Sequence, residues 1–136
     1  MSRPVRGCAL RGAIWIGLTA LPAAAGHGTG GPVLSLPGPY VKRLLDEGEP
    51  LVFVDLRPAD EFKRQRLPGA RSVPLRELLR RYAEVPRTGR VILYCDCLTE
   101  EIQAAYQFLR DQGYRNISVM EEGFPGWVKR GYPVER

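Results

Sequence analysis

The chain has 136 residues, a formal net charge of +5, 44% hydrophobic and 26% charged residues, and three cysteines. This composition is typical of one globular domain and excludes a collagen-like fibre, a disordered tail and a multidomain enzyme. Residues 1–25 contain Arg3, Arg6 and Arg11 and no acidic residue, whereas the remainder contains 17 basic and 15 acidic side chains. The folded part is therefore close to neutral, and nucleic-acid binding is not indicated.

The first 25 residues have the pattern of a secretory signal peptide. A basic stretch ending at Arg11 is followed by an apolar stretch over residues 12–21 and by Ala23-Ala24-Ala25, which provides an Ala-x-Ala cleavage site. The apolar stretch is shorter than the roughly 20 residues that span a bilayer. We therefore expect a periplasmic or secreted protein with no stable membrane insertion after cleavage. An uncleaved membrane anchor is the alternative.

Residues 26–37 are rich in glycine and proline, and we expect them to form a flexible lead-in. They contain His27, the only histidine of the chain, which is either a solvated linker residue or a metal ligand near the new N-terminus. No histidine remains for the domain expected over residues 38–136. Hydrolase mechanisms that pair a serine or a cysteine with histidine are thereby excluded.

Residues 38–136 alternate between strand and helix patterns. Strands are expected over the apolar runs 51–54, 90–94 and 117–120, with a short extended piece over 71–74. Helices are expected over 40–45, 59–62, 75–83 (apolar positions Leu75, Leu78 and Leu79) and 100–112, with a short helical tail after Trp127. This alternation predicts an α/β fold, in which a small parallel β-sheet is flanked by helices on both faces.

Cys95 directly follows the strand expected over 90–94 and precedes the helix expected over 100–112. Ligands of open α/β sheets bind at the carboxyl ends of the strands, where loop amides and a helix N-terminus stabilise a thiolate. The alternative is a buried, inert cysteine. The adjacent Asp96 and Cys97 argue against a role in packing alone.

Three motifs stand in order along residues 38–135. They are Val54-Asp55-Leu56-Arg57 with Leu67-Pro68-Gly69-Ala70, then Leu93-Tyr94-Cys95 before a loop and a helix, then Gly123-Phe124-x-x-Trp127 with Gly131-Tyr132-Pro133-Val134. In this order they resemble the motifs of single-domain rhodaneses. The resemblance implies a rhodanese-like fold and a sulfurtransferase whose Cys95 takes sulfane sulfur from a donor such as thiosulfate, becomes a persulfide and passes the sulfur to an acceptor.

An anionic persulfide on Cys95 requires a lowered thiol pKa and a cup of N–H donors. We expect the backbone from residue 96 to residue 101 to form this cup. The predicted substrate-binding residues are Asp96, Leu98, Thr99, Glu100, Glu101 and Arg57. Arg57 is interpreted mainly as the partner of Asp55 in a structural ion pair, with substrate contact as the alternative.

The loop after Cys95 departs from the family pattern in its charge. Asp96, Glu100 and Glu101 place three carboxylates near the thiol. Like charge raises a thiol pKa and repels a dianionic donor, so efficient turnover of thiosulfate is not expected. Alternatively, Glu100 and Glu101 are acids of the first helical turn that favour the helix dipole, with Thr99 as the N-cap.

Cys97 is the other unusual feature of this loop. We expect it to act with Cys95 in catalysis, attacking the persulfide, releasing sulfide and leaving a disulfide that a partner reduces. The alternatives are a disulfide without this role and a soft-metal site, which lacks further ligands because the domain has no histidine. We expect no resident metal and no cofactor.

The same residues bear on other classes of function. A phosphatase of this fold needs an arginine where Glu101 stands. A thiol-disulfide redox protein using Cys95 and Cys97, and a non-catalytic rhodanese-like binding module, remain as alternatives. The expected partners are a small sulfur donor, such as thiosulfate or a persulfide, and a thiol acceptor or protein reductant. A set of arginines forms either a docking surface for an acidic partner or a solvated face, namely Arg64, Arg66, Arg71, Arg80 and Arg81.

Overall fold

The computed structural model describes residues 31–136. The expected signal peptide over residues 1–25, together with Cys8 and His27, lies outside the described residues. Within residues 31–136, no helix is long and apolar enough to cross a membrane. One sheet of five strands has the order β1-β5-β4-β2-β3, and every pair of neighbours is parallel. The strands are β1 Ser35–Leu36, β2 Leu51–Asp55, β3 Arg71–Ser72, β4 Arg90–Tyr94 and β5 Ile117–Met120.

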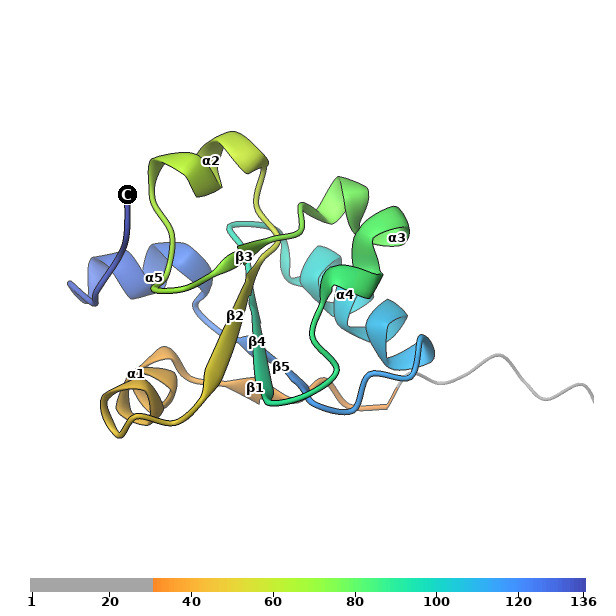
Figure 1. Cartoon of the computed structure of the whole chain (residues 1–136), viewed down its shortest axis with the longest axis horizontal. Helices are drawn as coiled ribbons and strands as arrows, with labels where there is room; N and C mark the ends of the chain where they lie inside the picture. Colours follow the sequence, from red (N-terminus) through yellow and green to blue (C-terminus); the bar gives the residue numbers. More distant parts are fainter. Residues whose placement is uncertain (1–30) are drawn as a thin grey trace, which may run out of the picture.

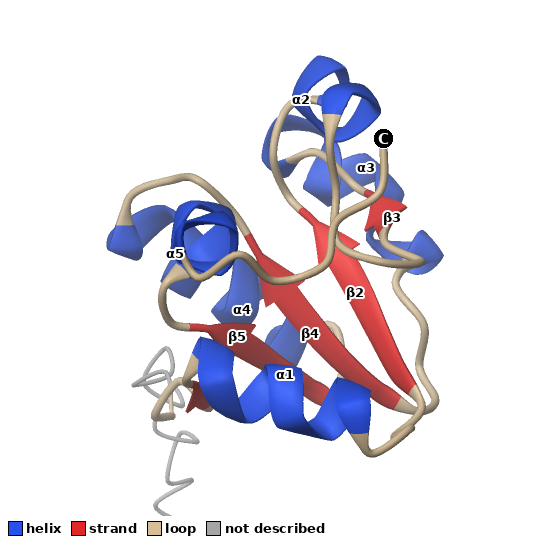
Figure 2. Cartoon of the chain, turned by 90° about the vertical axis from the view of Figure 1, so that its left-hand side faces the viewer, coloured by secondary structure: helices blue, strands red, loops and turns tan. Residues whose placement is uncertain are grey.

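Helices cover both faces of this sheet (Figures 1 and 2). One face carries α1 Gly38–Asp46 and α5 Gly123–Lys129. The other face carries α4 Thr99–Asp111 and three short segments, η1 Leu75–Glu77, α3 Leu78–Arg81 and η2 Tyr82–Glu84. The remaining helix, α2 Ala59–Arg64, follows the carboxyl end of β2. The predicted fold class, a parallel sheet flanked by helices on both faces, is confirmed.

The central strand β4 is apolar at four successive positions because both of its faces are buried. Val91 and Leu93 pack in the cluster beneath α4, whereas Ile92 and Tyr94 pack in the cluster beneath α1 and α5. All four residues are fully buried. Successive side chains of a strand point to opposite faces, so a strand between two helical layers requires apolar residues on both. This buried run places β4 in the middle of the sheet, and Cys95 follows directly at its carboxyl end.

The prediction of one continuous helix over residues 75–83 is wrong, and so is the prediction that Leu79 lies on its apolar face. The segment is divided into η1, α3 and η2, and Leu79 is 70% exposed instead of buried. A 3₁₀ turn has three residues per turn, so Leu75 and Leu78 share one face and Leu79 is rotated away from it. Both Leu75 and Leu78 pack on the core.

The sequence did not predict β1, which lies within the expected lead-in. Its pairing with β5 includes the Val119 amide, which donates to the Leu34 carbonyl at 2.9 Å, and the Glu121 amide, which donates to the Leu36 carbonyl at 3.1 Å. The C-terminal helix α5 also begins earlier than expected. Trp127 lies within it and is 1% exposed.

Candidate active site

Cys95 lies at the carboxyl end of β4, where the chain leaves the sheet toward α4. The residue is buried, with 5% of its surface exposed. Its carbonyl oxygen accepts a hydrogen bond from the Phe124 amide at the start of α5. Gly123, with φ of +57°, permits this approach, because a Cβ atom there would collide with the Cys95 carbonyl oxygen. The β4–α4 and β5–α5 connections therefore meet at Cys95.

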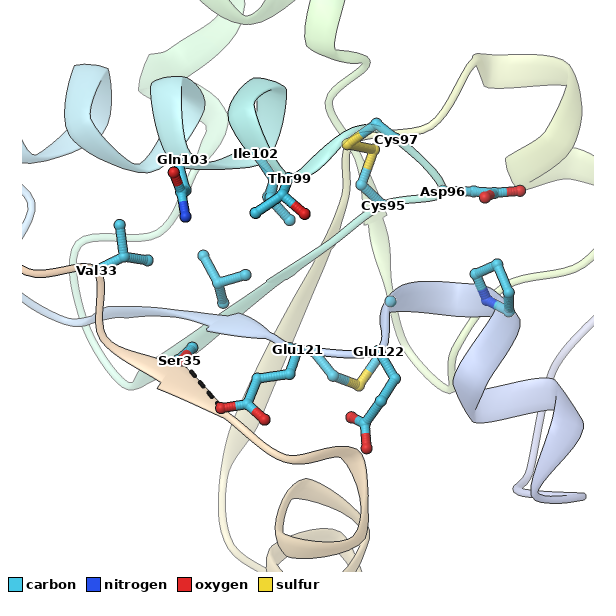
Figure 3. A pocket seen from close by; sticks show the side chains of 14 residues that line it. Val33, Ser35, Cys95, Asp96, Cys97, Thr99, Ile102, Gln103, Glu121 and Glu122 are labelled. Atoms are coloured by element: carbon cyan, nitrogen blue, oxygen red, sulfur yellow. Dashed lines mark hydrogen bonds between the residues drawn. A yellow bond between two sulfur atoms is a disulfide. The ribbon is translucent and has the colours of Figure 1, made fainter.

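The Sγ atoms of Cys95 and Cys97 are joined in a disulfide. Cys97 is half-buried, so it is the more accessible of the two. Figure 3 shows the disulfide at the edge of a cavity, with the carboxylate of Asp96 directed away from both sulfur atoms. The structure thus holds the oxidised form of the pair. Cys95 becomes a thiolate nucleophile only after this bond is reduced.

A buried polar network holds the strand ends beneath Cys95. The Asp55 carboxylate accepts hydrogen bonds from the Tyr94 hydroxyl at 2.6 Å, from Arg57 Nη2 at 2.6 Å and from the Arg57 amide at 2.9 Å. Arg57 Nη2 also donates to the Gln65 carbonyl, and its guanidinium lies 3.6 Å from the ring centre of Phe124. Arg57 is 3% exposed. Asp55 and Arg57 therefore form the ion pair that the sequence predicted.

This network perturbs the ionisation of its members. Burial, with the charge and hydrogen bond of Asp55, raises the pKa of Tyr94 well above its ordinary value. For Arg57, burial disfavours the charged form most strongly, yet the hydrogen bond and charge of Asp55 outweigh it and raise the pKa. The Tyr94 hydroxyl and the Arg57 guanidinium therefore keep their protons. They serve as fixed donors beneath the site.

The N-terminus of α4 differs from the expected arrangement by one residue. Leu98, and not Thr99, is the N-cap, and its side chain has no capping group. The Glu101 carboxylate makes the other half of a capping box by accepting a hydrogen bond from the Leu98 amide at 3.0 Å. The Glu101 amide in turn donates to the Leu98 carbonyl. The Leu98 and Glu101 amides, which were expected to help bind a persulfide, therefore already donate to other groups. The Glu101 carboxylate stabilises the N-terminus of α4.

Two cavities share Cys95, Asp96 and Cys97 as a common wall. The first, of about 470 Å³, is here named the β5-side cavity because residues 119–123 line it, as Figure 3 shows. The second, of about 410 Å³, is named the β2-side cavity because Leu56 and Arg57 line it, together with residues 74–77 and Glu101. The active-site loop is therefore accessible from two sides with different surroundings.

The structure brings most of the predicted site residues to these cavities. Asp96 lines both, Thr99 lines the β5-side cavity, and Arg57 and Glu101 line the β2-side cavity. Leu98 and Glu100 line neither, and both are exposed. Among the three expected carboxylates, those of Asp96 and Glu101 belong to residues that line a cavity, and the Asp96 carboxylate is directed away from both sulfur atoms.

Sequence reasoning missed four charged residues that line the cavities, namely Arg76, Glu77, Glu121 and Glu122. Glu121 and Glu122 follow β5 directly, as Cys95 follows β4, and neighbouring parallel strands end at the same edge of a sheet. That shared edge was the signal that could have placed them beside Cys95. Arg76, in η1 after β3, lines the β2-side cavity. No motif marked it, because its position depends on how the segment after β3 turns.

Glu122 is held at its place by two donors. The Gly38 amide donates to Glu122 Oε2 at 2.6 Å, and Arg130 Nη2 lies 3.2 Å from Glu122 Oε1. Burial disfavours its charged form, but the Gly38 and Arg130 contacts prevail and lower its pKa. Glu121 accepts a hydrogen bond from the Ser35 hydroxyl at 3.0 Å. The β5-side cavity is therefore bordered by anions that are anchored to β1 and α1.

Two further sequence predictions concern metals and the arginine surface. Residues 31–136 contain no group of three or more His, Cys, Asp or Glu side chains placed to hold a metal ion. Of the surface arginines, Arg64, Arg66 and Arg81 form ion pairs within the chain. Much of this charge is thus neutralised internally, which favours the interpretation of a solvated face.

Comparison with known proteins adds the following similarities. The family model described as "Rhodanese-like domain" matches residues 39–130. A sulfurtransferase of Allochromatium vinosum is 29% identical over 93 residues, covering 68% of this chain and 85% of that protein. The crystal structure of thiosulfate sulfurtransferase from Pseudomonas aeruginosa has a TM-score of 0.64 and 33% identity, over 76% of this chain but 20% of that one. A crystal structure of a protein from Anabaena is similar in fold, with a TM-score of 0.66 and 24% identity. The similarity covers 74% of this chain and 81% of that one.

Proposed function

This chain belongs to the rhodanese-like sulfurtransferase family, and we propose that within it Cys95 carries sulfane sulfur as a persulfide that Cys97 resolves. The observation that carries the proposal is the contact between the two sulfur atoms. Cys95 ends the central strand β4, and the Cys97 sulfur lies within bonding reach of its sulfur. A persulfide formed on Cys95 therefore has a second thiol beside it.

The first step is a displacement at sulfur. The thiolate of reduced Cys95 attacks the outer sulfur of a small donor such as thiosulfate. A new bond forms between the Cys95 sulfur and the transferred sulfur, and the sulfur–sulfur bond of the donor breaks. Sulfite leaves with the bonding electron pair. The resulting anionic persulfide lies near the N-terminal end of α4, where backbone amides favour negative charge.

The second step returns the sulfur as sulfide. The persulfide first takes up a proton from solvent on its outer sulfur. The Cys97 thiolate then attacks the Cys95 sulfur, the Cys95–Cys97 bond forms, and hydrosulfide leaves with that proton and with the electron pair of the broken persulfide bond. The two cysteines together lose two electrons, and the transferred sulfur gains them. A dithiol protein or a small thiol then reduces the disulfide and is itself oxidised. The disulfide of the structure corresponds to the product of this step.

A thiol-disulfide redox protein is the second candidate, and the disulfide itself favours it. Such a protein would cycle between the dithiol and the disulfide without gaining sulfur. The two candidates share the last step, reduction of the Cys95–Cys97 bond. They differ in how the bond forms, because only the sulfurtransferase releases sulfite and sulfide while forming it.

Product analysis separates the two candidates. The chain carrying Cys8→Ser is reduced, freed of reductant and mixed with thiosulfate. A sulfurtransferase with a resolving cysteine gives one sulfite, one sulfide and one disulfide per chain. Its Cys97→Ser variant gives sulfite without sulfide, and its Cys95→Ser variant gives neither. Disulfide formation without sulfite would contradict the transferase proposal and favour the redox protein.

We also propose that the protein acts outside the cytoplasm, with a thiol acceptor or protein reductant as its partner there. The support is the basic, apolar and small-residue order of residues 1–25. The test is the mass of the protein recovered from the periplasm or medium of an expressing bacterium. A mass that begins at residue 26 supports export. Recovery of the full-length chain from the cytoplasm alone would contradict it.

A further inference from the structure

We propose that Arg76 binds the anionic group of the sulfur donor, and that the donor reaches Cys95 through the β2-side cavity. This inference rests on the proposed sulfurtransferase function and assigns the side of entry and the residue that recognises charge. Arg76 lines the β2-side cavity together with Cys95 and Cys97. It lies in η1, the short turn that follows β3.

The β5-side cavity is unsuited to an anion. Its charged lining residues are Asp96, Glu121 and Glu122, and among the described residues no arginine or lysine lines it. Asp96 lines both cavities, and Glu122 is paired with Arg130. Within residues 31–136, Glu121 is therefore the carboxylate without an ion pair that a dianion would meet only on this side.

The β2-side cavity is also lined by three acidic residues, Glu77, Asp96 and Glu101. It differs from the β5-side cavity because two arginines, Arg57 and Arg76, line it as well.

Most charges of the β2-side cavity are already engaged by other groups. Glu77 pairs with Arg81 at 2.6 Å, and the Glu101 carboxylate accepts from the Leu98 amide. Arg57 is held by Asp55 and by the Gln65 carbonyl. Binding a donor at Arg57 would require breaking a buried ion pair, which is costly.

Arg76 is the cation that stays available. Its side chain is exposed, and within residues 31–136 it forms no ion pair. The guanidinium fork matches the oxygens of a sulfonate or carboxylate, and it keeps its charge at any physiological pH. Arg76 therefore attracts an anionic donor and offsets its repulsion by the carboxylates of the active-site loop.

The backbone around Arg76 is fixed to the strand that holds the buried ion pair. The Val73 amide donates to the Asp55 carbonyl at 3.0 Å, and the Leu75 amide donates to the Leu56 carbonyl at 2.9 Å. Val73 and Pro74 are buried. Arg76 thus projects from a turn that is anchored on the carboxyl end of β2, close to the wall formed by Cys95.

The test compares two exposed arginines with two donors. Arg76→Gln is matched by Arg80→Gln, which makes the same charge change on α3 at a residue that lines neither cavity. Both arginines are exposed, so neither substitution is expected to unfold the protein. A difference in KM between the two variants therefore reports on donor binding.

Sulfide release is measured with dithiothreitol as acceptor, and the rate without protein is subtracted. Thiosulfate is the anionic donor and dimethyl trisulfide the uncharged one. The Cys95 thiolate attacks the central sulfur of dimethyl trisulfide, methanethiolate leaves, and dithiothreitol cleaves the resulting mixed trisulfide to the Cys95 persulfide.

We expect Arg76→Gln to raise the KM for thiosulfate by about tenfold, the effect of losing one charge-assisted hydrogen bond, with kcat within about twofold. Arg76→Lys restores part of the affinity, while Arg80→Gln and all kinetics with dimethyl trisulfide stay unchanged. An unchanged KM for thiosulfate in Arg76→Gln, or an equal loss with the uncharged donor, would overturn the inference alone. A wild-type chain that takes sulfur from neither donor would overturn the proposed function itself.

Discussion

The carbonyl oxygen of Cys95 accepts a hydrogen bond of 2.9 Å from the amide of Phe124. This bond connects the loop that carries the candidate nucleophile to the first turn of α5, although Cys95 follows β4 and Phe124 follows β5. The Phe124 ring in turn lies against the Arg57 guanidinium, at 3.6 Å from the ring centre. The position of Cys95 is therefore set by the end of β5 and the end of β2, as well as by its own strand.

Gly123→Ala tests this arrangement. We expect it to lower the free energy of unfolding and the rate of sulfur transfer, because its Cβ atom collides with the Cys95 carbonyl oxygen. Gly131→Ala is the matched control, since Gly131 also has positive φ, +69°, but no atom lies within 4 Å of its added Cβ. We expect Gly123→Ala to cost about 1–3 kcal/mol more than the control in chemical denaturation. Equal losses would show that the close approach is unimportant.

Asp55→Asn tests the buried network. It removes the buried counter-charge of the Arg57 guanidinium, which is 3% exposed, and leaves only the partly exposed Glu61 carboxylate at 3.7 Å. We therefore expect a loss of about 3–5 kcal/mol in the free energy of unfolding. Asp60→Asn breaks an ion pair of the same kind with Arg64 at the surface, where both side chains are mostly exposed. That control is expected to lose less than about 1 kcal/mol. Similar losses from both variants, measured in urea, would contradict the structural role.

The raised pKa of Tyr94 predicts how stability changes in alkali. Burial and Asp55 keep the Tyr94 proton on the folded chain, whereas the unfolded chain loses it near pH ~10. The free energy of unfolding should therefore fall as the pH rises above about 10, because the unfolded state releases a proton that the folded state keeps. Tyr94→Phe should decline less steeply above that pH, although it is less stable at neutral pH through loss of the bond to Asp55. Identical slopes would contradict this assignment.

The different exposure of the two sulfurs predicts which one an external thiol attacks. Cys95 is buried and Cys97 is half-buried, so a thiol reaches the Cys97 sulfur first and Cys95 leaves as the thiolate. We expect brief treatment of the oxidised Cys8→Ser chain with glutathione, followed by alkylation, to give glutathione on Cys97 and the alkyl group on Cys95. Fragmentation of the peptide that carries both cysteines distinguishes the two products. The reverse pattern would contradict the predicted direction of attack.

Much of the fold was predictable because its central strands are covered on both faces. The apolar runs of β4 and β5 gave the correct bounds for both strands. The strand β1 was not predictable from such a run, since Ser35 and Leu36 form a strand only through pairing with β5. Leu79 was placed wrongly because a 3₁₀ turn changes the helical phase, and no local signal marks that change.

The candidate site was predictable where it depends on chain order and not where it depends on neighbouring strands. Cys95 and Cys97 follow a recognisable strand directly, so their position could be inferred. Glu121 and Glu122 required the knowledge that β5 lies beside β4. The contact between Glu101 and the Leu98 amide depends on a side-chain conformation that the sequence does not specify.

The mass of the intact chain after reaction with thiosulfate tests the central claim most directly. The measurement uses reduced Cys8→Ser/Cys97→Ser, in which the sulfur on Cys95 cannot be released by the second thiol, with Cys8→Ser/Cys95→Ser as the control. The proposal predicts that the first variant gains the mass of one sulfur atom, that dithiothreitol removes it, and that the control gains none. If the first variant gains no sulfur, or if the control gains it equally, Cys95 is not the sulfur carrier.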